Sequence, residues 1–199
     1  MSVEESRWEI SYCMTESNDY LLMKNDVPLD DVKNPREAVK EMMSSSIKRP
    51  MEKNDIIITF GIGLCYQLDE VYNTYPSRIF VYEPDTKLLH FVLNNVDISE
   101  HLKSGRVYLF DDLDDLIRKL SELYLTKDKV EIIYLKNYAV IKSQELLELT
   151  QKVYDTCKSK TVDINTITRY SRFWLENTLN NIHNINESNI YKLSDLYDK

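Results

Sequence analysis

The chain has 199 residues, of which 43% are hydrophobic and 11% aromatic, so it can form one globular domain with a sizeable core and is not a disordered segment. Its net charge of −8 argues against binding to nucleic acids or anionic membranes, because both favour a basic surface. No apolar run is long enough to span a bilayer, the N-terminus has acids where a signal peptide needs bases, and the three cysteines are far apart. We therefore expect a cytoplasmic protein with reduced thiols.

A β-hairpin and a helix are predicted for the first fifty residues. Two β-prone runs, Trp8–Thr15 and Tyr20–Lys24, flank a short polar turn. Asn34 followed by Pro35 is typical of a helix start, because it combines a capping side chain with proline at the first helical position. We therefore expect residues 1–50 to form an N-terminal hairpin and helix.

Strands and helices alternate over residues 51–160. The predicted strands are Ile56–Ile58, Ile79–Tyr82, Val107–Phe110 and Val130–Leu135, and the predicted helices are Leu64–Tyr75, Thr86–Asn95, Ser99–Lys103, Asp112–Tyr124 and Ser143–Lys158. Such alternation predicts a mostly parallel sheet with right-handed crossovers. The sequence thus indicates an α/β fold with a Rossmann-like, methyltransferase-like core flanked by helices.

Residues 161–199 depart from this alternation. Thr166–Ile182 is predicted to be a long helix with an aromatic pair, Phe173 and Trp174, that favours a docking contact over a cofactor site. No predicted strand follows it, and the remaining tail is polar. We interpret residues 161–199 as a helical extension and a linker toward a C-terminal domain that this chain lacks.

The first strand of the core leads into a glycine turn. Gly61 and Gly63 stand between that strand and a predicted helix, and Glu83 follows Gly61 by 22 residues, at the end of the next strand. In nucleotide-binding α/β folds an acid at about this spacing binds a ribose hydroxyl. We therefore predict Gly61, Gly63 and Glu83 as cofactor-binding residues, with Asp111, after the third strand, as a contact to an adenine amino group.

Tyr66 occupies the position of the third glycine in G-x-G-x-x-G. A side chain there would crowd a pyrophosphate, so a dinucleotide fits poorly. An adenosyl ligand such as S-adenosylmethionine fits better because it has no pyrophosphate. The alternative is that the glycines only form a βα turn and that Glu83 only ends a strand. The sequence leaves both interpretations open.

Other candidate residues favour structural roles. The acids at positions 111, 112, 114 and 115 adjoin a predicted helix start, where carboxylates cap free N–H groups and complement the helix dipole. Cys65 lies in the glycine turn, but no histidine is close in sequence, so a buried thiol is favoured over a nucleophile. The three histidines are isolated. We therefore predict no catalytic residue and no metal site.

Several stretches resemble the N-terminal domain of motility accessory factor (Maf) proteins, which are related to the MptE-like, hydroxymethylpterin diphosphokinase group. They are Ile58–Tyr66, Ile79–Asp85, and Tyr20–Leu22 ahead of Pro35–Ala38, and Trp174–Ile182 resembles the segment that follows that domain. The resemblance is ordered along most of the chain. Its most specific part is the W-x-x-N-x-L-x-N pattern.

This resemblance implies a role in flagellin glycosylation. Maf proteins are cytoplasmic bacterial glycosyltransferases that transfer nonulosonic sugars from CMP-activated donors to serine or threonine of flagellin. Their central domain carries a glycine-proline-serine motif, which is missing from this sequence. The resemblance thus implies a non-catalytic interaction or substrate-presenting domain, with flagellin and a C-terminal glycosyltransferase domain as partners and self-association left open. The alternative from the glycine turn is an S-adenosylmethionine-dependent methyltransferase or another nucleotide-binding α/β enzyme.

Overall fold

A computed structural model describes residues 10–29 and 31–162 of the chain. The described residues up to Cys157 belong to one compact unit, and the chain divides after Cys157, inside a helix that covers residues 143–162. The predicted helix Thr166–Ile182, with Phe173 and Trp174, lies outside the described residues. The fold below is that of the first unit.

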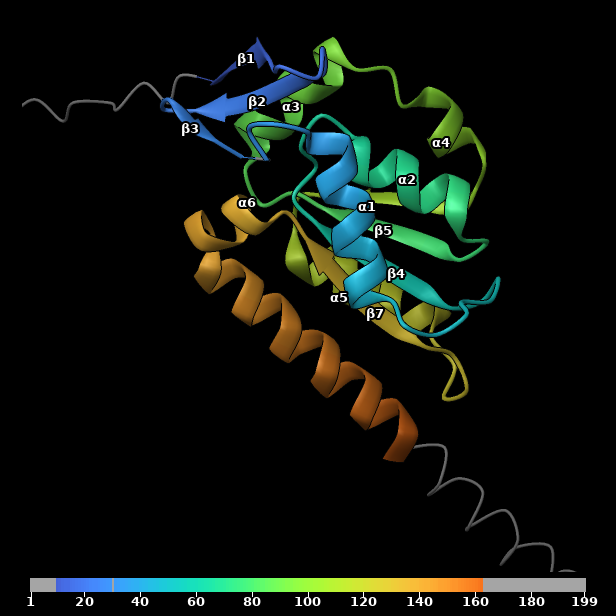
Figure 1. Cartoon of the computed structure of the whole chain (residues 1–199). Coiled ribbons are helices and arrows are strands. Elements are labelled where there is room, and N and C mark those ends of the chain that lie inside the picture. Colours follow the sequence, from blue (N-terminus) through green and yellow to red (C-terminus); the bar gives the residue numbers. More distant parts are fainter. Residues whose placement is uncertain (1–9, 30, 163–199) are drawn as a thin grey trace, which may run out of the picture. The chain divides into compact units, whose positions relative to one another are not determined.

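An antiparallel sheet and one helix precede the main sheet. The strands are β1 (Ile10–Met14), β2 (Tyr20–Lys24) and β3 (Val27–Pro28), in the order β1-β2-β3, followed by helix α1 (Pro35–Ser46) (Figure 1). The predicted hairpin is confirmed, whereas the two-residue strand β3 is too short to leave a periodic signal in the sequence. The Asn34 side chain accepts a hydrogen bond from the backbone N–H of Glu37 at 3.1 Å, which confirms the predicted cap.

The main sheet is parallel and has four strands. They are β4 (Ile56–Phe60), β5 (Arg78–Tyr82), β6 (Val107–Phe110) and β7 (Val130–Tyr134), in the order β6-β5-β4-β7. The predicted α/β fold with a parallel sheet flanked by helices is thus confirmed. The chain steps from β4 to β5 to β6 in one direction and then returns to place β7 on the other side of β4. The order therefore reverses between β4 and β7, where open α/β sheets have their ligand crevice.

Helices cover both faces of this sheet. They are α2 (Tyr66–Thr74), α3 (Thr86–Asn95), α4 (Ser99–Lys103), α5 (Leu113–Leu123) and α6 (Lys136–Ile141). α1 and α2 lie on one face and α5 on the other (Figure 1), as right-handed crossovers require. The helix of residues 143–162 meets α5 through an ion pair of 2.8 Å between Lys152 and Asp114. Within the described ranges, no helix has both the length and the apolar character to cross a membrane.

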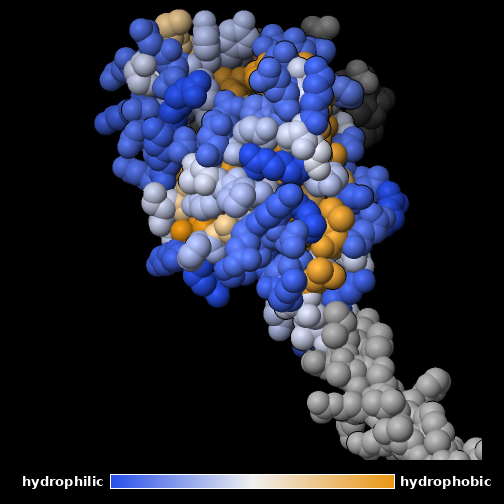
Figure 2. Space-filling view, turned by 90° about the vertical axis from the view of Figure 1, so that its right-hand side faces the viewer, coloured by the Kyte–Doolittle hydropathy of each residue, from blue (hydrophilic) through white to orange (hydrophobic). Residues whose placement is uncertain are grey.

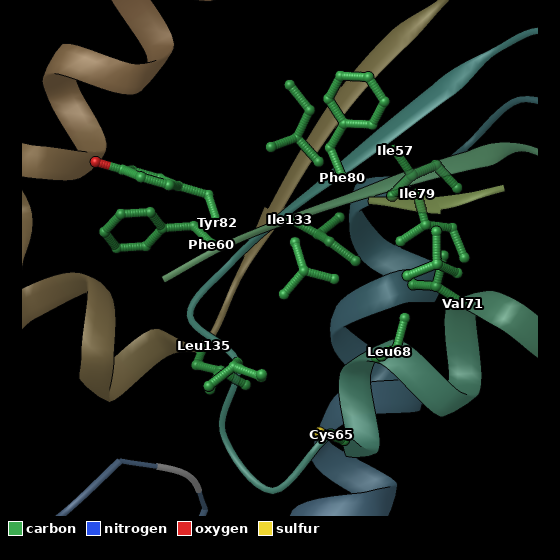
Figure 3. Close-up of a cluster of buried hydrophobic side chains, with 14 of the residues drawn as sticks. Ile57, Phe60, Cys65, Leu68, Val71, Ile79, Phe80, Tyr82, Ile133 and Leu135 are labelled. Atoms are coloured by element: carbon green, nitrogen blue, oxygen red, sulfur yellow. The ribbon is translucent and has the colours of Figure 1, made fainter. Parts of the chain in front are cut away.

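The core is centred on β4. All five of its residues are buried, as expected for a central parallel strand. On one face Val71 of α2 lies beside Ile57 and Ile79, and on the other the rings of Phe60 and Tyr82 are 6.0 Å apart between centroids (Figure 3). Outside this core the surface is largely hydrophilic, with small separate hydrophobic areas on the face that Figure 2 shows.

Helix α2 begins at Tyr66, two residues later than the predicted Leu64. The prediction was wrong because Gly63 and Cys65 have φ angles of +49° and +67°, and a right-handed helix cannot include such residues. The Tyr66 hydroxyl accepts a hydrogen bond from the backbone N–H of Tyr20 at 3.0 Å and donates one to its carbonyl at 3.1 Å. The residue in the third glycine position thus ties the N-terminal sheet to α2.

Replacing Tyr66 by phenylalanine should loosen this sheet. The change removes two hydrogen bonds to the backbone of β2, so we expect a loss of about 1 kcal/mol in stability and faster hydrogen exchange at the Tyr20 amide. Native-state hydrogen exchange measures both. Tyr134→Phe, at a half-exposed tyrosine of β7, is the control. An unchanged exchange rate at Tyr20 in the Tyr66→Phe variant would contradict this role.

Candidate functional site

Three neighbouring strands of the main sheet end in predicted site residues. Gly61 follows β4, Glu83 follows β5 and Asp111 follows β6. The backbone N–H of Gly61 donates to the carbonyl of Tyr82 at 2.9 Å, and the N–H of Glu83 donates to the carbonyl of Phe110 at 2.9 Å. The three residues therefore lie at the carboxyl ends of neighbouring strands, on the side of the sheet where the strand order reverses between β4 and β7.

The glycine turn needs glycine for two reasons. Gly61 has φ +87°, a conformation that L-residues rarely adopt. A Cβ atom on Gly61 would also lie 2.6 Å from Cδ1 of Tyr138, a residue of α6 that is fully buried. The space that the missing Cβ of Gly61 leaves is therefore occupied by the ring of Tyr138 and not left for a ligand.

The carboxylate of Glu83 is fully buried, and both of its oxygens accept hydrogen bonds. Its Oε2 accepts a hydrogen bond from the backbone N–H of Ile62 at 3.0 Å, and its Oε1 accepts one from the N–H of Asp85 at 2.9 Å. The hydroxyl of Tyr138 donates a third hydrogen bond, to Oε1. A ribose hydroxyl would compete with the Tyr138 hydroxyl for Oε1. The geometry thus places Tyr138 where the sequence predicts a ribose.

Burial dominates the titration of this pair. It raises the pKa of Glu83 from 4.5 to about 7, although the hydrogen bonds from Tyr138 and Ile62 act in the opposite direction. Burial also raises the pKa of Tyr138 well above its ordinary value, and the neighbouring Glu83 charge adds to the shift. Tyr138 therefore keeps its proton and acts as a donor to Glu83.

A buried ion pair extends this network to the N-terminal sheet. Lys24 of β2 is 5% exposed and pairs with Asp85, which follows β5 by three residues. The Asp85 carboxylate also caps α3 by accepting from the N–H groups of Lys87 and Leu88 at 3.1 and 3.2 Å. Burial raises the pKa of Asp85, but the hydrogen bonds from Lys24 and Leu88 outweigh it, so this pKa lies below its ordinary value. Asp85 therefore remains ionised and paired.

Asp112 and Cys65 have the structural roles that the sequence favours. Asp112 caps α5, since its side chain accepts a hydrogen bond from the N–H of Asp115 at 2.9 Å. Asp111 is exposed beyond the end of β6. Cys65 is buried, and burial, with a smaller contribution from the charge of Asp69, raises the pKa of its thiol to about 12, which disfavours nucleophilic chemistry. No group of three or more His, Cys, Asp or Glu residues among those described could hold a metal ion.

Two of the clefts in the described part of the chain illustrate where its surface is hollowed away from the glycine turn. One, of about 460 Å³, is lined by residues of α1, α2 and α4 and includes Arg36 and His101. Another, of about 430 Å³, lies between α1 and the segment after β7 and includes Met42 and Tyr134. Neither cleft is lined by Gly61, Gly63, Glu83 or Asp111.

Tyr138 is the site residue that the sequence did not reveal. It lies on α6, a six-residue helix for which no element was predicted. It is one of 14 tyrosines, and nothing in the local sequence distinguishes it from the others. Its partner Glu83 is 55 residues away, so the contact depends on the return of the chain from β6 to β7.

Comparison with solved structures shows a distant similarity. No family model matches the chain, and no curated protein matches its sequence. Among solved structures the chain is similar to a probable spermidine synthase from Corynebacterium glutamicum ATCC 13032, with a TM-score of 0.43 and 18% identity over 66% of this chain. The similarity spans 50% of that protein. At this level the likeness concerns the fold alone, and the site has to be interpreted from its own residues.

The raised pKa of Glu83 predicts an unusual pH dependence. Between pH 4.5 and about 7 the folded state binds more protons at Glu83 than the unfolded state, so stability should fall as pH rises through this range. The loss attributable to Glu83 is at most about 3 kcal/mol. Urea denaturation between about pH 5 and pH 8 measures it.

The matched variants are Glu83→Gln, which removes the titrating group, and Glu122→Gln, which changes an exposed acid of α5. Glu83→Gln should lose this fall in stability with pH, while Glu122→Gln should keep it. The same pH dependence in the wild type and in Glu83→Gln would show that Glu83 does not titrate with a raised pKa.

A second prediction separates backbone strain from contact with Tyr138. Gly61→Ala introduces both, so we expect a loss of about 2–4 kcal/mol. Gly105 also has a positive φ, +72°, but a Cβ there would have no neighbour within 4 Å. Gly105→Ala should therefore cost only about 1–2 kcal/mol, from strain alone. Equal losses in thermal or urea denaturation would mean that the contact with Tyr138 adds nothing.

Proposed function

We propose that this chain is a non-catalytic interaction or substrate-presenting module of a Maf-type flagellin glycosyltransferase. The observation that carries the proposal is the filled edge of the main sheet. Tyr138 packs against Gly61 and donates a hydrogen bond to the buried carboxylate of Glu83. Because open α/β sheets bind their ligands at this edge, a side chain of the protein in that position supports a role that needs no nucleotide there.

The resemblance to Maf proteins supplies the rest of the proposal. It includes the glycine turn and the second strand, Ile58–Tyr66 and Ile79–Asp85, as well as Trp174–Ile182. Flagellin and a glycosyltransferase domain are the partners that follow from it, and the cytoplasm is the location. The acidic balance of the chain, with a net charge of −8, supports polypeptide partners over nucleic acids.

An S-adenosylmethionine-dependent methyltransferase, or another nucleotide-binding α/β enzyme, is the second candidate. It is favoured by the positive φ angles of Gly61 and Gly63 and by an acid at the end of β5. Asp111 is exposed at the same edge and could contact an adenine amino group. In this function the ligand would compete with Tyr138 for the Glu83 carboxylate.

Titration calorimetry with S-adenosylmethionine, S-adenosylhomocysteine, CMP and NAD distinguishes the two candidates. We expect no binding up to about 1 mM, which means a binding free energy weaker than roughly −4 kcal/mol. Micromolar binding of an adenosyl ligand that is lost in Glu83→Ala, but kept in the exposed-site control Glu37→Ala, would replace our proposal with the enzyme. Circular dichroism should establish that each variant is folded.

The same protein should bind flagellin. Biolayer interferometry with immobilised monomeric flagellin should give saturable binding, whereas an unrelated acidic protein of similar size should give none. Absence of binding at about 100 μM, weaker than roughly −5 kcal/mol, would contradict a flagellin-directed role.

A further inference from the structure

The two sheets have four edges in the described part of the chain, and three of them are protected against pairing with another chain. β3 is two residues long and ends in Pro28, which has no N–H to donate. β7 carries a charged side chain, Glu131, within the strand. β6 has only four residues and lies against α4 and α5. Short length, proline, charge and cover are the usual means of protecting an edge strand.

β1 has none of these protections. Its five residues, Ile10–Met14, include no charge and no proline, and four of them are exposed. Among the described residues its one strand partner is β2, so its other edge offers backbone N–H and C=O groups to a further strand. Tyr12 and Met14, on the same face of the strand, are 52% and 58% exposed. A neutral, apolar edge strand of this kind is suited to pair with a further strand.

The side chains of β1 complement a second copy of the same strand. In an antiparallel pair related by a two-fold axis at Tyr12, Ile10 lies opposite the partner's Met14, and Ser11 lies opposite the partner's Cys13. Apolar side chains then meet on one face and small ones on the other. Because the strand carries no charge, no like charges meet near the axis. This register pairs all five residues of the strand.

Tyr12 is held in place for such a contact. Its ring packs edge-on against Tyr20 with centroids 5.5 Å apart, and it lies 6.3 Å from the ring of Phe91 on α3. Half of its surface nevertheless remains exposed. A rigid, half-exposed aromatic side chain loses little conformational entropy when a partner covers it.

We propose that β1 pairs with β1 of a second copy of this chain, antiparallel and centred on Tyr12, so that two three-stranded sheets join into one of six strands. The contact is isologous, as two-fold symmetry requires. It is built from one short strand on each side, so we expect an affinity in the micromolar range (a Kd of roughly 1–100 μM). It uses β1 alone and does not depend on the proposed role with flagellin.

Sedimentation equilibrium of the full chain, from about 1 to 300 μM at roughly 0.15 M salt, tests the pairing. The wild type should form dimers. Tyr12→Lys should weaken dimerisation at least about tenfold, because two like charges then face each other across the axis. Val140→Lys, at a 79% exposed valine of α6, should dimerise like the wild type. A monomeric wild type over this range, or equal dimerisation of Tyr12→Lys, overturns the proposal.

Two further variants protect this test against misfolding and check the register. Tyr12→Glu and Tyr12→Lys should each dimerise more weakly than the wild type, yet an equimolar mixture should associate more strongly than either variant alone, which an unfolded variant could not do. Under oxidation Ser11→Cys should form a disulfide with Cys13 of the partner subunit, because opposite residues of an antiparallel pair lie within disulfide range. Val27→Cys, on the exposed edge strand β3, is the control. Failure of the mixture to associate, or equal cross-linking of the two cysteine variants, overturns the pairing.

Discussion

The buried carboxylate of Glu83 is the constraint on which the edge of the main sheet depends. A carboxylate that is 0% exposed is tolerated only when its oxygens accept hydrogen bonds. The three donors, Ile62, Asp85 and Tyr138, come from the turn after β4, the segment after β5 and the helix after β7. The hydrogen bonds to this one carboxylate therefore hold three separate segments of the chain close together. Removing any one donor would leave a buried acceptor oxygen with fewer hydrogen bonds.

The same carboxylate connects the main sheet to the N-terminal sheet. Asp85, which donates its N–H to Glu83, also pairs through its side chain with Lys24 of β2. The hydroxyl of Tyr66 binds the backbone of Tyr20 at the other end of that strand. Two polar contacts thus attach both ends of β2 to the part of the chain that contains the main sheet.

The sequence predicts most of this fold because its signals are local. The isoleucine run Ile56–Ile58, the capping pair Asn34 and Pro35, and the alternation of strands and helices each follow from short-range physics. Glu83 could be recognised as a special position from its spacing to the glycine turn. The start of α2 could not be predicted, because nothing in the sequence indicates the left-handed conformation of Cys65.

Tyr138 was unpredictable for a different reason. Its role arises from a contact between residues 55 positions apart, on a six-residue helix that is shorter than the window in which periodicity can be recognised. Tyr138, which the sequence does not single out, therefore changes how the spacing of Gly61 and Glu83 is interpreted. Gly61 and Glu83 have the spacing of a ligand site, but their partner is the chain itself.

The contact of Tyr138 with Glu83 at the main sheet and the exposed strand β1 both bear on what kind of partner the chain could bind. When the carboxyl edge of a parallel sheet is closed by its own side chains, small-molecule binding at the usual place requires rearrangement, whereas polypeptide recognition requires only accessible surface. Main-chain hydrogen bonds along an open edge supply affinity, and alternate side chains supply specificity. β1 offers both, because its outer edge is open in the sheet and Tyr12 and Met14 project from one face. The hydrogen bond between Tyr138 and Glu83 and the open edge of β1 are thus the two features on which the proposed contacts between chains rest.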